Sequence, residues 1–129
     1  MKIVFLLAIA IVVGCKAKHK ETCDPDFDVF FNKFTHDSIF QKRRVHFPLK
    51  EFYNDIDSEE LVEQQVNADQ YFFTALPDNA DGLYDIKIEK KKNSVTYMQT
   101  SRESYASTIW KFARVHECWM LIEITNITE

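Results

Sequence analysis

The spacing of hydrophobic residues changes near residue 44, and this change restricts the fold more than any other feature. Before it, four phenylalanines share one helix face at the i, i+3, i+4, i+7 spacing: Phe27, Phe30, Phe31 and Phe34. After it, apolar and polar residues alternate, as they do in a β-strand with one covered face. The order of a helical segment followed by strands predicts an α+β domain.

Capping residues place the helices. Asp24 is expected to cap the first helix, with Pro25 at its first position. Asp37 is expected to start a second, short helix that ends near residues 42–44, where three cations suit the negative end of the helix dipole.

The strands are expected at residues 45–53 and then in a meander: 84–88, 95–98, 105–115 and 118–124. Pro48 indicates an edge strand or a bulge in the first of these. Residues 60–66 fit a strand or a helix equally well. The capping-box spacing of residues 67–70 predicts a short helix at residues 71–73, and residues 77–82 are expected to form a loop.

Glycine is scarce, and this excludes several enzyme classes. Gly14 and Gly82 are the only two, so the chain holds no glycine-rich phosphate loop, dinucleotide turn or Gly-x-Ser-x-Gly elbow. The 18 aromatic residues are too many for a disordered chain. General acid–base chemistry needs only one or two carboxylates, histidines or tyrosines in an apolar cup, and it stays open.

The N-terminus has the pattern of an export signal. An apolar run of eleven residues, 3–13, is too short to span a bilayer and fits a signal-peptide core. The segment ending in Gly14 and Cys15 resembles the lipobox of bacterial lipoproteins. The resemblance implies cleavage before Cys15 and lipid attachment to it; an ordinary cleaved signal or a buried N-terminal helix are the alternatives. We expect residues 1–14 to be the signal peptide, 15–23 a tether and 24–129 one domain.

The charge balance argues against nucleic acid as a partner. From residue 24 onward the chain has 12 Lys and Arg against 19 Asp and Glu. An acidic domain repels a phosphate backbone. The lysines of the tether, Lys16, Lys18 and Lys20, suit solvated spacing or contact with anionic lipid headgroups.

Two cysteines remain after Cys15. Cys23 and Cys118 lie in a compartment that permits a disulfide, but Cys118 falls on an apolar strand face where a free cysteine packs as a small hydrophobe. The unpaired state is therefore favoured over the bridge. Neither cysteine has a second ligand at zinc-finger spacing, so no zinc site is predicted.

The last hairpin has two apolar faces. A two-residue turn at His116 and Glu117 would pair Arg114 with Trp119 and Val115 with Cys118. One face then carries the aliphatic series Ile109, Ala113, Val115, Cys118, Met120, Ile122 and Ile124, interpreted as the core face. The other carries Trp110, Phe112, Arg114, Trp119, Leu121 and Glu123. Large aromatics beside a cation and an anion can line a cleft, although cross-strand pairs covering the second face of the sheet explain them as well.

An acidic segment at residues 51–63 begins like a calcium loop. Glu60 stands where the loop needs glycine and Val66 where it needs a bidentate acid, so the EF-hand interpretation fails. A solvated acidic face is favoured over a loose divalent site among Glu51, Asp55, Asp57, Glu59, Glu60 and Glu63. No metal or cofactor is predicted.

A family resemblance covers most of the domain. The pattern FxxFFxxFxxDxxFQxxRVxFPL at residues 27–49 and the hydrophobic spacing of residues 115–124 are similar to a family of uncharacterised Bacteroidetes lipoproteins. The resemblance implies a cystatin-like, nuclear transport factor 2-like fold, with N-terminal helices packed on a curved antiparallel sheet. It implies no catalytic residues.

Together these features favour a lipid-anchored protein of the bacterial cell envelope, on the periplasmic side of the outer membrane. We expect a non-catalytic domain that binds a partner protein or a small apolar ligand. One alternative is an acid–base enzyme of the isomerase or dehydratase type, with its cleft at Trp110, Arg114, Trp119 and Glu123. Another is an inhibitor of an envelope enzyme that uses the loop at residues 77–82.

Overall fold

The phenylalanine stripe forms a helix, as predicted. In the computed structural model, which describes residues 22–55, 57–76 and 81–128, helix α1 spans Phe27–His36 and helix α2 spans Ser38–Arg43. Asp37 caps α2 by accepting from the backbone N–H groups of Ile39 and Phe40, as expected. The cap of α1 is Asp26 rather than Asp24, because the Asp26 carboxylate reaches the free N–H groups of the first turn.

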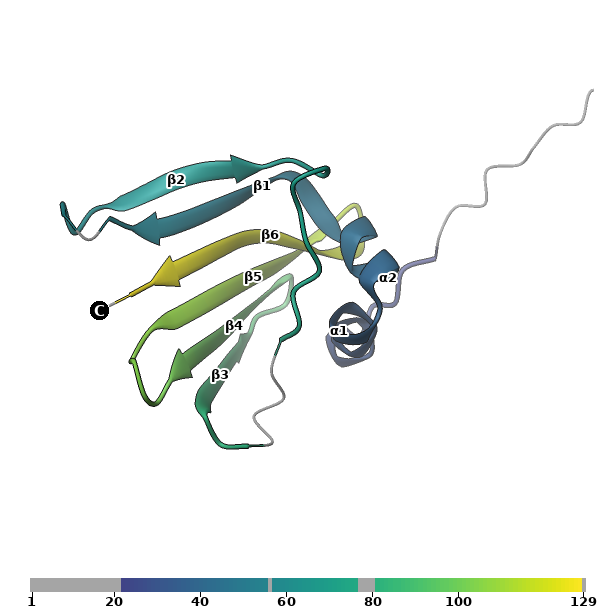
Figure 1. The fold of residues 1–129 in the computed structure, drawn as a ribbon. Helices are drawn as coiled ribbons and strands as arrows, with labels where there is room; N and C mark the ends of the chain where they lie inside the picture. The colour runs from purple at the N-terminus through teal and green to yellow at the C-terminus, as the bar shows by residue number, and fades with distance from the viewer. Residues whose placement is uncertain (1–21, 56, 77–80, 129) are drawn as a thin grey trace, which may run out of the picture.

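Six strands form one sheet (Figure 1). They are β1 (Val45–Asn54), β2 (Leu61–Val66), β3 (Tyr84–Lys90), β4 (Ser94–Ser101), β5 (Ser107–Val115) and β6 (Cys118–Ile127), in the order β2-β1-β6-β5-β4-β3. The segment at residues 61–66, which fitted a strand or a helix, is thus a strand. The predicted pairing of Arg114 with Trp119 and of Val115 with Cys118 is confirmed.

The sheet is mixed, not purely antiparallel as expected. After β2 the chain crosses to the opposite edge, returns through β3, β4 and β5, and inserts β6 beside β1 in the parallel direction. Pro48 lies in β1, where the register against β6 shifts between Val45 and Lys50. β1 is an inner strand, so the bulge alternative is the correct one.

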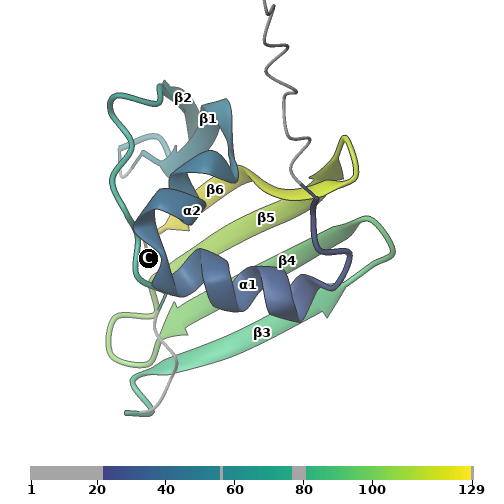
Figure 2. The ribbon, with the colours of Figure 1, turned by 90° about the vertical axis from the view of Figure 1, so that its right-hand side faces the viewer.

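The core lies between α1 and one face of the sheet, which we call the inner face (Figure 2). This face carries the buried side chains Val95, Tyr97, Trp110, Phe112, Trp119 and Leu121. The phenylalanines of α1 pack edge-on against it, with ring centroids of Phe27 and Phe34 at 5.4 and 5.2 Å from that of Phe112. The aromatic stripe and the aromatic sheet face therefore form a single core.

The connection between β2 and β3 contains no helix at residues 71–73, contrary to the prediction. The Gln70 side chain does accept from the Asn67 N–H, as in a capping box, but the turn ends there. A hydrogen-bonding side chain from α2 determines the conformation instead. The fully buried Gln41 donates to the Thr74 carbonyl at 2.9 Å and accepts from the Tyr71 hydroxyl at 2.8 Å and the Thr74 N–H at 2.9 Å. These bonds hold the connection in an extended form across the inner face.

Cys15, the predicted signal peptide and most of the predicted tether fall outside the described residues. Within the described part of the chain, no helix is long and apolar enough to cross a membrane.

Candidate functional site

The side chains predicted to line a cleft lie mainly in the core. Trp110, Phe112 and Trp119 are almost completely buried on the inner face beneath α1. The ring of Phe27 packs against Trp119 with centroids 5.2 Å apart, and the indole N–H of Trp119 donates to the Pro25 carbonyl at 3.1 Å. These aromatics therefore fill the space where the cleft was expected.

The two faces of the last hairpin are assigned the other way round from the prediction. The aliphatic series, including Ile109, Val115 and Met120, is half-buried on the outer face, while the aromatics meet the helix. The register between β5 and β6 shifts after Lys111, so that Ile122 is an extra residue and the alternation inverts beyond it. Ile124 consequently faces Trp110 on the inner side.

The same bulge removes Glu123 from the predicted site. Glu123 pairs with Lys111 on the outer face and forms an ion pair with it at 2.7 Å. Arg114 stays near Trp119, with its guanidinium carbon 5.8 Å from the ring centroid, and donates to the Glu117 carbonyl. The structure thus brings Arg114 and Trp119 together, and it places Glu123 on the other side of the sheet.

Cys23 and Cys118 form a disulfide, so the favoured unpaired state is not the one that the structure shows. The bridge joins residues 95 positions apart, with their Cα atoms 5.2 Å apart. Cys118 lies on the outer face, beside the start of the domain, because the face assignment is inverted. The disulfide fixes the end of the tether to the β5–β6 hairpin.

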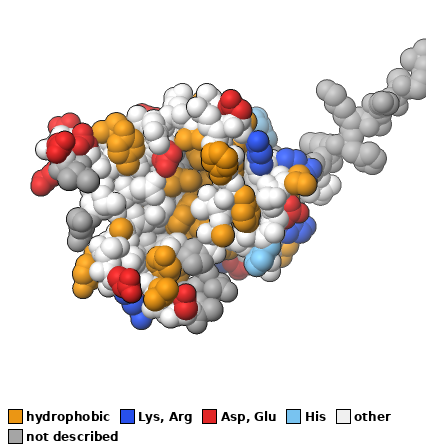
Figure 3. Space-filling view, viewed as in Figure 1, with side chains coloured by type: hydrophobic (Ala, Val, Ile, Leu, Met, Phe, Trp, Pro, Cys, Tyr) orange, Lys and Arg blue, Asp and Glu red, His pale blue; other side chains and the backbone are white. Residues whose placement is uncertain are grey.

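The acidic segment forms the tip of the β1–β2 hairpin, where acidic side chains gather at the left of the space-filling view (Figure 3). Glu59 lies at this tip with a left-handed backbone, and Asp55 accepts from the Asp57 N–H. In the described portion, no three His, Cys, Asp or Glu side chains gather as metal ligands would.

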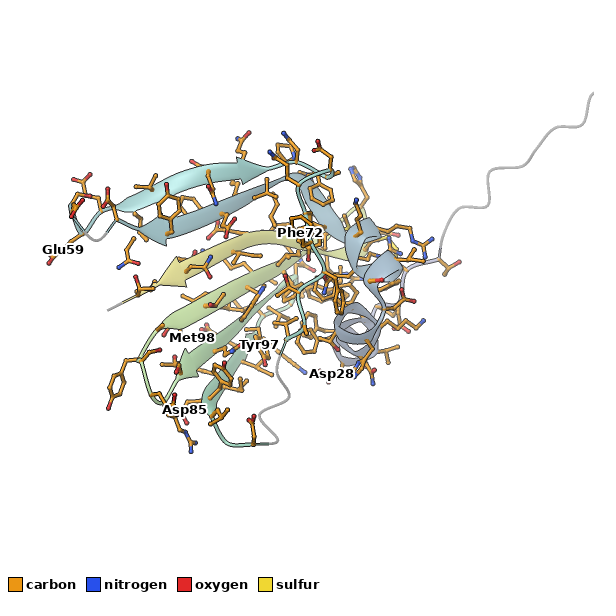
Figure 4. The ribbon with its side chains drawn as sticks, viewed as in Figure 1. Asp28, Glu59, Phe72, Asp85, Tyr97 and Met98 are labelled. Carbon is orange, nitrogen blue, oxygen red and sulfur yellow. A yellow bond between two sulfur atoms is a disulfide. The ribbon has the colours of Figure 1, made fainter. Side chains whose placement is uncertain are left out.

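The structure has an apolar hollow of about 710 Å³ between α1 and the β3–β4 hairpin, which we call the helix–hairpin cleft. Tyr97 on β4 and Asp28 on α1 border it (Figure 4). Its apolar lining comprises Phe31, Ala75, Leu76, Ile86, Ile88 and Tyr97. Its polar lining comprises Asp28, Asn32, Thr35 and His36. The volume falls within the range of small-molecule sites.

The Asp28 carboxylate and the Nδ1 atom of His36, which border this cleft, have structural partners. Asp28 forms an ion pair with Lys90 at 2.7 Å. The Nδ1 of His36 lies 2.8 Å from the Asn32 carbonyl and 3.0 Å from the Thr35 hydroxyl. What remains to contact a ligand is mainly apolar and aromatic surface, which selects for apolar molecules.

A second hollow of about 430 Å³ lies on the other side of the connection, against β1 and β2; we call it the linker groove. Glu51 lies in it, and its two carboxylate oxygens accept from the Gln64 and Asn126 amides, each at 3.0 Å. The Thr108 hydroxyl in turn donates to the side-chain amide oxygen of Asn126 at 3.1 Å. This row of polar groups crosses the inner face from β2 to β5.

Tyr71 and Phe72 form the other wall of the linker groove. Burial raises the pKa of Tyr71 from 10.0 to about 12, and a side-chain hydrogen bond with Thr74 opposes part of that shift. The phenol therefore stays protonated at physiological pH and donates to Gln41. Phe72 takes no part in this hydrogen-bond network; it lines the groove and is 82% exposed.

Sequence reasoning missed both hollows. The helix–hairpin cleft depends on a connection predicted to be helical, and the polar row depends on β1 lying beside β6. The one available signal was the spacing of Glu51 two residues from both Leu49 and Tyr53, because residues two apart in a strand lie on the same face.

Comparison with known proteins agrees with the fold. A family model described as "Domain of unknown function (DUF4348)" matches residues 11–128. An NTF2-like protein from Bacteroides fragilis NCTC 9343 has a similar structure at 24% identity, with a TM-score of 0.65 over 85% of this chain and 50% of that one. A cystatin-like protein from Bacteroides caccae ATCC 43185 is similar at 16% identity, with a TM-score of 0.57 over 81% of this chain and 77% of that one.

The chain therefore spans half the length of the first of these structures. No match is found among curated proteins. The expected cystatin-like, nuclear transport factor 2-like fold is confirmed, and the similarity at these identities concerns the fold alone.

Proposed function

Because this chain belongs to the DUF4348 family, whose function is unknown, we propose its role from its own geometry: it is a lipid-anchored, non-catalytic domain of the bacterial cell envelope that binds a small apolar ligand. The observation that carries the proposal is the helix–hairpin cleft, a hollow of about 710 Å³ with a mainly apolar and aromatic lining. Ile88, on the β3 side of this hollow, is 47% exposed although it is a large aliphatic residue.

Binding accounts for the cleft better than catalysis does. General acid–base chemistry needs a carboxylate or imidazole directed at the substrate. Asp28 is bound by Lys90, which donates to both of its oxygens, and His36 is bound through Nδ1 to the helix backbone. These polar groups hold α1 and β3 in place around an apolar interior.

The anchor supports a location at the membrane surface. Cys15 precedes the disulfide-bonded Cys23 by eight residues, which span at most about 28 Å when fully extended. The domain would therefore stay close to the bilayer, where apolar small molecules concentrate. Several acyl chains on Cys15 would make this attachment stable.

Co-purification tests the ligand. The full chain is isolated from its membrane, extracted with organic solvent and analysed by mass spectrometry, beside the variants Ile88→Asn and Leu61→Asn. Both residues are exposed aliphatics on strands, and Leu61 lies on β2 away from the cleft. We expect an apolar molecule in near-stoichiometric amount in the wild type and in Leu61→Asn, and a loss of at least fivefold in Ile88→Asn. Equal amounts in the two variants, or no molecule in the wild type, would contradict the proposal.

Metabolic labelling with an alkynyl fatty acid tests the anchor. We expect wild-type protein to carry the label and to sediment with membranes, and Cys15→Ser to lose the label. A labelled, membrane-bound Cys15→Ser protein would exclude Cys15 as the lipidated residue.

A further inference from the structure

The linker groove contains a carboxylate that is bound only by neutral groups within the described residues. The partners of Glu51 are the amides of Gln64 and Asn126, and the Thr108 hydroxyl orients Asn126. Each carboxylate oxygen thus has one donor and keeps further acceptor capacity. A half-buried carboxylate in this state attracts a cation more strongly than a solvated one does.

Aromatic and aliphatic side chains surround this carboxylate. The aliphatic residues Leu49, Val66 and Ile124 and the aromatic residues Tyr71 and Phe72 line the same groove as Glu51. Phe72 extends from the connection in front of the sheet (Figure 4) and is 82% exposed, although the Gln41 hydrogen bonds fix the connection on both sides of it. The ring therefore borders the groove without being part of the core.

A groove that holds both a carboxylate and aromatic rings matches the chemistry of an organic ammonium ion. The carboxylate accepts N–H groups and balances the charge, aromatic faces attract the cation, and aliphatic side chains cover the carbon skeleton. A neutral molecule would gain only the last of these contacts. An inorganic metal ion would need several oxygen ligands, and the groove supplies a single carboxylate.

We propose that the linker groove is a second binding site, specific for a small organic ammonium ion, with Glu51 as the charge partner and Phe72 as the aromatic contact. The volume of about 430 Å³ suits a molecule of roughly ten non-hydrogen atoms. The acidic balance of the domain, 12 cationic against 19 anionic side chains from residue 24 onward, favours the approach of a cation. The site is separate from the helix–hairpin cleft and does not depend on the ligand proposed there.

Calorimetry with two matched probes tests the proposal. The full chain in non-ionic detergent is titrated at pH 7 with 2-phenylethylammonium and with its neutral isostere 2-phenylethanol. We expect saturable binding of the ammonium ion that is at least tenfold tighter than binding of the alcohol. Glu51→Gln should abolish this preference while the weak affinity for the alcohol persists.

Two further variants separate recognition from folding and from bulk charge. Glu63→Gln removes a carboxylate from β2 at a position paired with Phe52, one residue out of phase with the groove, and should leave the preference unchanged. Phe72→Ala changes an exposed side chain, so it should fold normally and bind the ammonium ion at least fivefold more weakly. The proposal is overturned if the ammonium ion does not bind saturably, or if both Glu51→Gln and Phe72→Ala bind it as the wild type does. Ile88→Asn should not alter ammonium binding, which distinguishes this site from the helix–hairpin cleft.

Discussion

Replacing Phe112 tests whether the inner face of the sheet is the core. Its ring is 0% exposed and lies at the centre of the α1 stripe. Ring centroids of Phe27, Phe30, Phe31 and Phe34 all lie 5.2–5.8 Å from it, at interplanar angles of 67–90°. Edge-to-face pairs of this kind each contribute about 0.5–1.5 kcal/mol beyond the area that they bury.

The size of the effect follows from these contacts. Truncation of a fully buried phenylalanine to alanine costs about 3–5 kcal/mol, and the four ring contacts place Phe112→Ala in the upper half of that range. Phe112→Leu keeps most of the volume but loses the aromatic edges, so we expect a loss of about 1–2 kcal/mol. Phe72→Ala, at an 82% exposed phenylalanine, should cost less than about 0.5 kcal/mol.

Urea unfolding followed by tryptophan fluorescence measures all three variants, since Trp110 and Trp119 lie in the same core. With an m-value of about 1.5 kcal/mol/M, Phe112→Ala should lower the midpoint by about 2.7–3.3 M. A loss below about 1 kcal/mol in Phe112→Ala would refute the assignment of the inner face as core. It would favour the cleft that the sequence suggested for this residue.

Three further perturbations have defined outcomes. Replacing Cys23 and Cys118 together by serine should lower the free energy of unfolding by roughly 3–5 kcal/mol, because the disulfide joins residues 95 positions apart. Reductant should lower the free energy of unfolding of the wild type to the same value and leave that of the variant unchanged. Gln41→Leu should lower the free energy of unfolding in urea by at least about 3 kcal/mol, because the Tyr71 hydroxyl and the backbone groups of Thr74 lose their hydrogen-bond partners. Gln41→Glu keeps acceptor oxygens for two of these groups, so it should recover part of that loss. Burial raises the pKa of Tyr71 from 10.0 to about 12 in the folded protein, so the contribution of Tyr71 to stability should be constant below pH 10 and fall by on the order of 2 kcal/mol towards pH 12. Tyr71→Phe should remove this contribution from a pH series of urea midpoints.

Local patterns sufficed to predict most elements of the fold. The stripe of four phenylalanines, the Asp37 cap and the alternation of residues 84–88 and 95–98 each describe short-range geometry, and the structure contains the corresponding helices and strands. The pairing of Arg114 with Trp119 could also be predicted from local sequence, because a two-residue turn fixes the register of the hairpin. His116 and Glu117 both adopt left-handed backbone angles there, as such a turn demands even without Asn-Gly.

The site was not predictable in the same way, because it depends on contacts between distant segments. Both faces of the β5–β6 hairpin are apolar, so alternation alone could not tell which one meets α1. The extra residue Ile122 then inverts the alternation and moves Glu123 to the outer face. The residues between β2 and β3 carry a local helix signal, but Gln41 on α2 overrides it with tertiary hydrogen bonds.

The place of β6 in the sheet has a consequence for export. Among the described strands, β6 alone pairs with both β1 and β5, so without β6 the hairpin of β1 and β2 would be separate from the three-stranded sheet of β3 to β5. A chain that crosses a membrane N-terminus first delivers this strand last of the six. Two-stranded hairpins are marginal in water, so if the chain is exported as we propose, the sheet would be completed only after β6 has crossed. Any anchor at Cys15 would already hold the N-terminus at the bilayer while this closure takes place.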